Sequence, residues 1–180
     1  MNQPVVDRQA LLITGTVGVG KTSVADLLGD LLATARLPHA VIDLDRICQS
    51  WPPPETDPFN FRVLLRNLHG LTTVYRDAGA RRIVLAGVAE SVEQRHAYEM
   101  ALGIPLQVCR LTAEAASVRA RLTRRHKGDG DSNSRRWHLG RAGELDRILD
   151  RADVADFTID TTHLTLPAVA AAVLTATAWA

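Results

Sequence analysis

Short apolar runs alternate with amphipathic stretches along the chain. The runs have the length of buried strands, and the stretches between them repeat apolar residues at the three- and four-residue spacing of a helix. The predicted strands are residues 10–14, 40–44, 82–88, 106–111 and 157–160. The predicted helices are residues 21–35, 58–75, 90–102, 113–126, 135–151 and the stretch from 167 onward. This alternation predicts an α/β fold with a parallel sheet covered on both faces, whose ligands bind beyond the carboxyl ends of the strands.

A run of prolines interrupts the alternation between the second strand and the helix that follows it. Residues 51–58 read WPPPETDP. Successive prolines remove backbone donors and fix φ, so regular structure is excluded there. Asp57 and Pro58 are of the residue types favoured at the N-cap and the first position of a helix. We therefore expect Asp57 to be the N-cap of the following helix.

The composition is that of a globular protein. Of the 180 residues, 46% are hydrophobic and 23% charged, which predicts one domain over residues 1–180. Twenty-one Lys and Arg against 20 Asp and Glu leave a net charge of +1, so no overall basic field favours nucleic acid or anionic lipid as a partner.

Cys48 and Cys109 lack metal-ligand spacing and are expected to be reduced thiols. We recognise no secretion signal and no apolar stretch that would span a membrane, and therefore expect a cytoplasmic protein. The pattern is silent on oligomeric state.

The most specific motif is a phosphate-binding loop directly after the first strand. Residues 15–22 read GTVGVGKT, which matches G-x-x-x-x-G-K-[ST] in full, and an amphipathic helix follows. Its glycines let successive backbone N–H groups converge on phosphate oxygens, and the helix points its positive end at the same anion. Lys21 is expected to contact the β- and γ-phosphates, and the Thr22 hydroxyl to ligate Mg²⁺. The residues expected to bind the nucleotide are Gly15, Thr16, Val17, Gly18, Val19, Gly20, Lys21, Thr22 and Ser23.

A second group of chemistry-bearing residues ends the second strand. The third strand ends in Ala86, Gly87 and Val88, where many P-loop ATPases carry an acidic residue that holds magnesium through water. The strand pattern at residues 43–45, Asp-Leu-Asp, supplies carboxylates instead, and residues two apart in a strand point to one face. One carboxylate could organise Mg²⁺ and the other could accept the proton of an attacking hydroxyl. The alternative is a surface strand end with Asp45 capping the next turn.

With these residues, the chain resembles the small P-loop kinases of the shikimate, gluconate and adenylyl-sulfate kinase type and the chloramphenicol phosphotransferases. The resemblance implies a three-layer α/β/α fold with a five-stranded sheet in the order 2-3-1-4-5. It also implies that Asp45 is the general base and that Asp43 lies near magnesium. Adenosine triphosphate and Mg²⁺ would be the cofactors.

Arginines cluster around a polar, glycine-rich stretch in the second half of the chain. Residues 121–125, RLTRR, look like the Arg-Leu-x-x-Arg stretch that opens the lid in these kinases, and the implied lid covers about residues 121–140. Arginines there stack on adenine and neutralise the transferring phosphoryl group, which implies such roles for Arg121 and Arg125. The alternative is a solvated basic loop.

Candidates for the phosphoryl acceptor site are less specific. Arg62 and Arg66 lie one helical turn apart, on a helix that lines the acceptor pocket in the resembling kinases. They could bind an anionic acceptor or form the solvent face of that helix. Glu90 could contact the acceptor or only begin a helix, and Trp51 could form an acceptor wall or belong to the core.

Two functions fit these residues. The first is an ATP-dependent phosphotransferase that moves the γ-phosphoryl group of Mg-ATP to a small-molecule acceptor. The second is a nucleotide-binding switch or a partner-dependent ATPase, which would need no acceptor pocket and would tolerate changes at Asp45, Arg62 and Arg66. The nature of the acceptor is open, because one fold hosts many acceptors.

Overall fold

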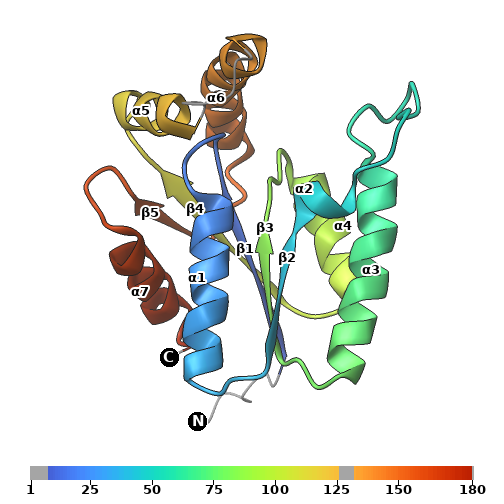
Figure 1. The fold of residues 1–180 in the computed structure, drawn as a ribbon. Helices are drawn as coiled ribbons and strands as arrows, with labels where there is room; N and C mark the ends of the chain where they lie inside the picture. Colours follow the sequence, from blue (N-terminus) through green and yellow to red (C-terminus); the bar gives the residue numbers. More distant parts are fainter. Residues whose placement is uncertain (1–7, 126–131, 180) are drawn as a thin grey trace.

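One parallel five-stranded sheet forms the centre of the protein. A computed structural model describes the backbone of residues 8–125 and 132–179, and the side chains of the same residues except 125–139. The strands are β1 (Gln9–Gly15), β2 (His39–Asp43), β3 (Arg82–Ala86), β4 (Leu106–Thr112) and β5 (Phe157–Asp160). Their order across the sheet is β2-β3-β1-β4-β5, with all neighbours parallel (Figure 1). The order implied by the resemblance is confirmed.

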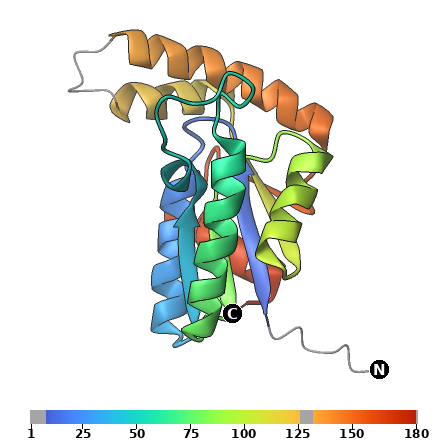
Figure 2. The same cartoon turned by 90° about the vertical axis from the view of Figure 1, so that its right-hand side faces the viewer.

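Helices cover both faces of the sheet and its carboxyl edge. They are α1 (Lys21–Thr34), α2 (Leu44–Ile47), α3 (Phe61–Asp77), α4 (Val92–Leu102), α5 (Ala115–Arg125), α6 (Ser132–Ala152) and α7 (Leu166–Thr177). Helices α1 and α7 lie on one face, and α3 and α4 on the other (Figure 1). Figure 2 shows α6 lying across the carboxyl ends of the strands, with α5 beside it. This is the three-layer α/β/α arrangement that we expected.

The central strand divides the core into two halves. Ala10 and Leu12 of β1 pack toward α3 and α4, whereas Leu11 and Ile13 pack toward α1 and α7. All four side chains are fully buried, because strand side chains alternate between the two faces and both faces are covered. Because both faces of β1 are packed, the strand is held in the centre of the sheet, and the phosphate loop that follows it begins there.

None of the helices in the described part of the chain has the length and apolar character of a membrane span.

Two local predictions were wrong. Strand β2 ends at Asp43, and Asp45 lies in the first turn of the short helix α2, so the two carboxylates do not share a strand face. The N-cap of α3 is Asn60 and not Asp57. Asp57 nevertheless caps this helix, because its carboxylate accepts hydrogen bonds from the backbone N–H groups of Phe61 and Arg62 at 2.7 and 2.9 Å.

Candidate active site

The phosphate loop runs from the end of β1 into α1 and depends on two glycines. Gly15 has a φ of +143°, and a Cβ there would overlap the carbonyl oxygen of Leu111 on β4. Gly18 has a φ of +80°, and a Cβ there would lie 2.7 Å from Cγ of Leu122. Only glycine combines these backbone angles with this close approach of neighbouring chain. The sequence motif therefore folds into the strained, tightly enclosed turn that phosphate binding requires.

The loop presents donors to its concave side. In the described part of the chain, the backbone N–H groups of Val17, Gly18 and Gly20 have no protein acceptor, which fits a site for phosphate oxygens. The Lys21 ammonium group donates to the carbonyl oxygens of Gly15 and Thr16 at 3.0 and 3.1 Å. This group therefore lies across the loop, where its charge can meet an anion.

Thr22 and Asp43 are brought together, as magnesium binding would require. The Thr22 hydroxyl donates to Oδ2 of Asp43 at 3.0 Å. Asp43 pairs in register with Ala86 on β3, so its carboxylate stands on the strand next to the one that lacks an acidic residue. Within residues 8–125 and 132–179, no three or more His, Cys, Asp or Glu are arranged so that they could hold a metal ion. A Mg²⁺ ion would therefore use the hydroxyl, the carboxylate, water and the phosphates of a nucleotide.

Asp45 lies beside these groups at the start of α2. Oδ1 of Asp43 accepts a hydrogen bond from the Asp45 backbone N–H at 3.0 Å, which makes Asp43 the N-cap of this turn. Desolvation raises the pKa of the Asp45 carboxyl, the charge of Lys21 opposes that rise, and the charge of Asp43 adds to it. Solvent reaches the side chain, and the surrounding protein still disfavours its charge. The carboxyl is thus basic for an aspartate and accessible to a second substrate.

Arg121 holds two loops together. Its guanidinium group donates to the carbonyl oxygen of Val19 in the phosphate loop at 3.0 Å. It also donates to the hydroxyl and the carbonyl oxygen of Thr161, after β5, at 2.9 and 2.7 Å. The residues around Thr161 form a turn, in which the Asp160 carboxylate accepts from the backbone N–H of Thr162 at 2.9 Å. Arg121 is therefore a half-buried structural contact between the phosphate loop and the turn after β5.

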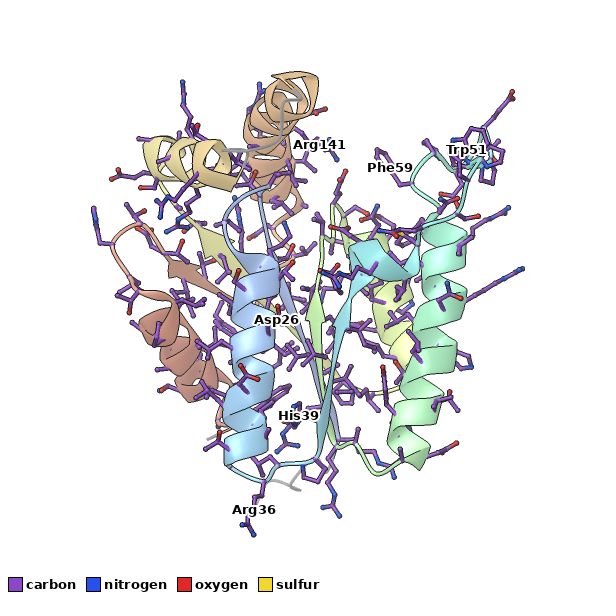
Figure 3. The ribbon with its side chains drawn as sticks, in the orientation of Figure 1. Asp26, Arg36, His39, Trp51, Phe59 and Arg141 are labelled. Carbon is purple, nitrogen blue, oxygen red and sulfur yellow. The ribbon has the colours of Figure 1, made fainter. Side chains whose placement is uncertain are left out.

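Helix α6 contacts both sides of the site through two adjacent residues. The carbonyl oxygen of Ala142 accepts a hydrogen bond from the Thr16 hydroxyl of the phosphate loop. The Arg141 guanidinium group forms an ion pair with Glu90, which follows β3, and lies over the Phe59 ring at 5.9 Å from its centroid. Figure 3 shows Arg141 and Phe59 reaching toward one another from α6 and from the loop before α3. The sequence analysis missed Arg141, because nothing in the pattern around it distinguishes it from a solvated arginine on a polar helix face.

Tyr98 is a second residue that the sequence analysis missed. Its hydroxyl group donates to the carbonyl oxygen of Val88 at 2.8 Å, and its ring packs against Phe61. Burial raises the pKa of Tyr98, and the charges of Asp45, Cys48 and Glu90 raise it further. Groups that follow both β2 and β3 therefore act electrostatically on one buried phenol. The only sequence signal was an aromatic residue at a buried helix position, which is far more often core.

The remaining predicted residues lie outside this group of contacts. Arg62 and Arg66 are exposed on α3, and among the described residues their guanidinium groups form no hydrogen bond or ion pair. Ser23 is exposed in the first turn of α1. The side chain of Arg125 lies outside the described residues, as do the side chains of the predicted lid from 125 to 139. Trp51 is 89% exposed, which excludes the core alternative for this side chain.

A cavity of about 540 Å³ lies along helix α5, apart from the contacts described above. It is lined by Ala116, Arg119, Ala120, Thr123 and Arg124 of α5. Val118 and Leu122 of the same helix face the phosphate loop, so the cavity is on the opposite side of α5. It is therefore not the place where the phosphate loop and the carboxylates meet.

Comparison with known proteins supports the fold. No protein-family model matches the chain, and no curated protein matches it significantly. Among solved structures, the tunicamycin resistance protein of Deinococcus radiodurans superposes with a TM-score of 0.63 at 20% identity, over 94% of this chain and 95% of that one. The APS kinase of Mycobacterium tuberculosis, in complex with AMPPNP and APS, gives 0.62 at 19% identity, over 94% and 96%. A gluconokinase from Sinorhizobium meliloti gives 0.59 at 17% identity, over 96% and 97%.

This chain has the P-loop kinase fold. The resemblance found in the sequence is thereby confirmed for the fold, across nearly the whole length of these kinases. The P-loop kinase fold also explains why the two carboxylates, the phosphate loop and α6 meet at one edge of the sheet, since ligands of open parallel sheets bind there.

Proposed function

We propose that this protein is an ATP-dependent phosphotransferase that moves the γ-phosphoryl group of Mg-ATP to a hydroxyl group of a small molecule. One observation carries the proposal. Hydrogen bonds and charge interactions link four residues from two segments at the carboxyl edge of the sheet, which are Lys21, Thr22, Asp43 and Asp45. A site that only binds a nucleotide would not need Asp45.

The phosphate loop would bind the nucleotide. The N–H groups of Val17, Gly18 and Gly20 and the amino end of α1 would bind phosphate oxygens, and Lys21 would exchange its contacts with Gly15 and Thr16 for the β- and γ-phosphates. Arg121 would keep this loop in place from the side of Thr161. Arg125 is proposed to contribute further positive charge.

Mg²⁺ fits the pair formed by Thr22 and Asp43. The hydroxyl and the carboxylate are oxygen donors of the kind that this ion prefers, and they already lie 3.0 Å apart. The ion would neutralise charge on the β- and γ-phosphates. Thr22 at the start of α1 and Asp43 at the end of β2 are the residues that would hold it.

Asp45 would be the general base. An acceptor hydroxyl beside it would transfer its proton to the carboxylate while its oxygen attacks the γ-phosphorus and ADP leaves. The raised pKa of Asp45 improves it as a proton acceptor. Glu90 would help to bind the acceptor, whereas exposed Arg62 and Arg66 fit the solvent face of α3 better than an anion site.

The proposal is tested by separating nucleotide binding from transfer. Lys21→Ala should lower turnover by about a hundredfold or more, because it removes a charge that binds the transferring group. Asp45→Asn should abolish transfer to a pool of metabolites and antibiotics, yet leave the Kd for Mg-ATP within about threefold in calorimetry. Near-normal turnover of Asp45→Asn would refute the assignment of the base. Wild-type protein that binds Mg-ATP and shows no pool-dependent ADP formation would favour a nucleotide switch instead.

A further inference from the structure

The ion pairs of Arg141 bear on the charge of the acceptor. Its Nη2 group contacts Oε1 of Glu90, and its Nη1 group lies 3.1 Å from Oε2 of Glu144. The Arg141 side chain is 17% exposed and that of Glu90 31%, so this contact is shielded from water more than the one with Glu144, whose side chain is 59% exposed. One positive charge is thus shared between two carboxylates.

This arrangement leaves a negative surplus on the acceptor side of the site. Asp45 and Glu90 both lie close enough to Tyr98 for their charges to act on its hydroxyl group. Arg141 and Lys21 supply two positive charges, whereas Asp43, Asp45, Glu90 and Glu144 supply four negative ones. An anionic acceptor would have to displace Glu90 from Arg141 or approach the excess of carboxylates, and like charges in a partly desolvated site repel strongly.

The same cluster offers an apolar surface. One part of the Phe59 ring contacts the Arg141 guanidinium group, and the ring is still 69% exposed (Figure 3). An exposed ring beside carboxylates favours an uncharged carbon skeleton or a cationic group, because the face of an aromatic ring attracts both. It offers nothing to a carboxylate or a phosphate.

We propose that the acceptor is an uncharged or cationic hydroxyl compound, and that Glu90 determines this preference by pairing with Arg141. The inference rests on the proposed phosphotransferase function. Glu90 acts here as a specificity residue, because its ion pair with Arg141 removes that guanidinium group from use by an anion.

A charge-sorted library of acceptors tests the inference. Hydroxyl compounds are grouped into anionic, neutral and cationic sets, with matched members such as glucuronate, glucose and glucosamine, and ADP formation from Mg-ATP is measured near neutral pH. We expect turnover with the neutral or cationic set and at least about tenfold less with anionic analogues of the active compounds. Turnover confined to the anionic set would overturn this inference and leave the phosphotransferase function standing. No turnover with any set, in protein that binds Mg-ATP, would overturn the function and the inference with it.

Two variants then identify the residue responsible. Glu90→Gln frees Arg141, so kcat/KM for the anionic analogue should rise about tenfold relative to its neutral counterpart. Glu93→Gln is the matched control, because it removes the same charge from an exposed position three residues along and leaves Arg141 paired. Calorimetric binding of Mg-ATP shows that each variant is folded. An unchanged ratio in Glu90→Gln, or the same change in Glu93→Gln, would refute the role of Glu90.

Discussion

At the scale of single residues, Asp45 illustrates how a reactive group opposes stability. Its pKa is raised in the folded protein, chiefly by desolvation, so folding favours the protonated carboxyl. Stability from this group is complete below the pKa of an unfolded aspartate and is lost as the pH rises through the folded pKa. At neutral pH the ionised carboxylate therefore costs stability, and only the proposed chemistry requires it.

The raised pKa of Asp45 predicts how Asp45→Asn changes thermal unfolding. At neutral pH the Tm of the variant should equal that of the wild type or exceed it by no more than about 3 °C, because solvent screens part of the effect. The difference should vanish toward pH values below the range in which an ordinary aspartate titrates. Thermal unfolding followed by circular dichroism across this range measures it. A variant that is clearly less stable at neutral pH would contradict the electrostatic account of Asp45.

The sequence revealed some functional residues and concealed others for a physical reason. The phosphate loop is eight consecutive residues, so its chemistry is visible without knowledge of the fold. The pair of Glu90 and Arg141 spans 51 positions, and only the packing of α6 on the sheet brings them together. Tyr98 likewise becomes informative only once the fold shows that the charges of Asp45 and Glu90 act on it.

At the scale of elements, the phosphate loop is held by the strand beside it. A methyl group at Gly15 would overlap Leu111 of β4 and lie 2.9 Å from Cγ1 of Val19. Gly79, after α3, also has a positive φ, +101°, and has open space around it. The two glycines thus share a positive φ, which disfavours other residues, but only at Gly15 would a Cβ meet neighbouring atoms.

Alanine at these two glycines should separate strain from function. Gly79→Ala should cost about 1 kcal/mol, which is the cost of a positive φ, and leave Mg-ATP binding unchanged. Gly15→Ala should destabilise more and weaken Mg-ATP binding by at least about tenfold, because the loop must move away from β4. Denaturant titration and calorimetry measure both quantities. Unchanged nucleotide affinity in Gly15→Ala would contradict the role of this contact.

Arg121 is the link between helix α5 and two loops. Arg121→Ala removes hydrogen bonds to Val19 and Thr161, and we expect a lower Tm and about tenfold weaker Mg-ATP binding. Arg119, exposed on the same helix, is the control and should tolerate alanine. Arg121→Lys should recover little, since an ammonium group lacks the fork that reaches both loops. Equal effects at Arg119 and Arg121 would refute a specific role for this contact.

The elements themselves were largely predictable from the sequence. All five strands were found, because the buried central strands give short apolar runs with sharp ends, and the edge strands β2 and β5 still carry apolar residues. Helix α2 was missed, since its four residues are too few to show helical periodicity. The N-cap of α3 was misplaced because Asn60 adopts a φ of +53°, a turn that the proline-rich pattern does not reveal.

At the scale of the whole molecule, the sheet order separates two halves of the site. The phosphate loop follows the central strand β1, with Arg121 and Thr161 toward β4 and β5 and the carboxylates toward β2 and β3. Helix α6 joins the halves, because Arg141 pairs with Glu90 and Ala142 accepts from Thr16. This arrangement suits a nucleotide on one side and an acceptor on the other, with the transferred group between them.

The most direct test of this account follows the γ-phosphoryl group itself. ATP labelled at that position is incubated with the protein, Mg²⁺ and a small-molecule extract, and the label is traced chromatographically. We predict that the label appears on an organic hydroxyl compound with wild-type protein and that this product is absent with Asp45→Asn. Label released only as inorganic phosphate, or retained in ATP that the protein demonstrably binds, would contradict the phosphotransferase and leave a nucleotide switch or ATPase.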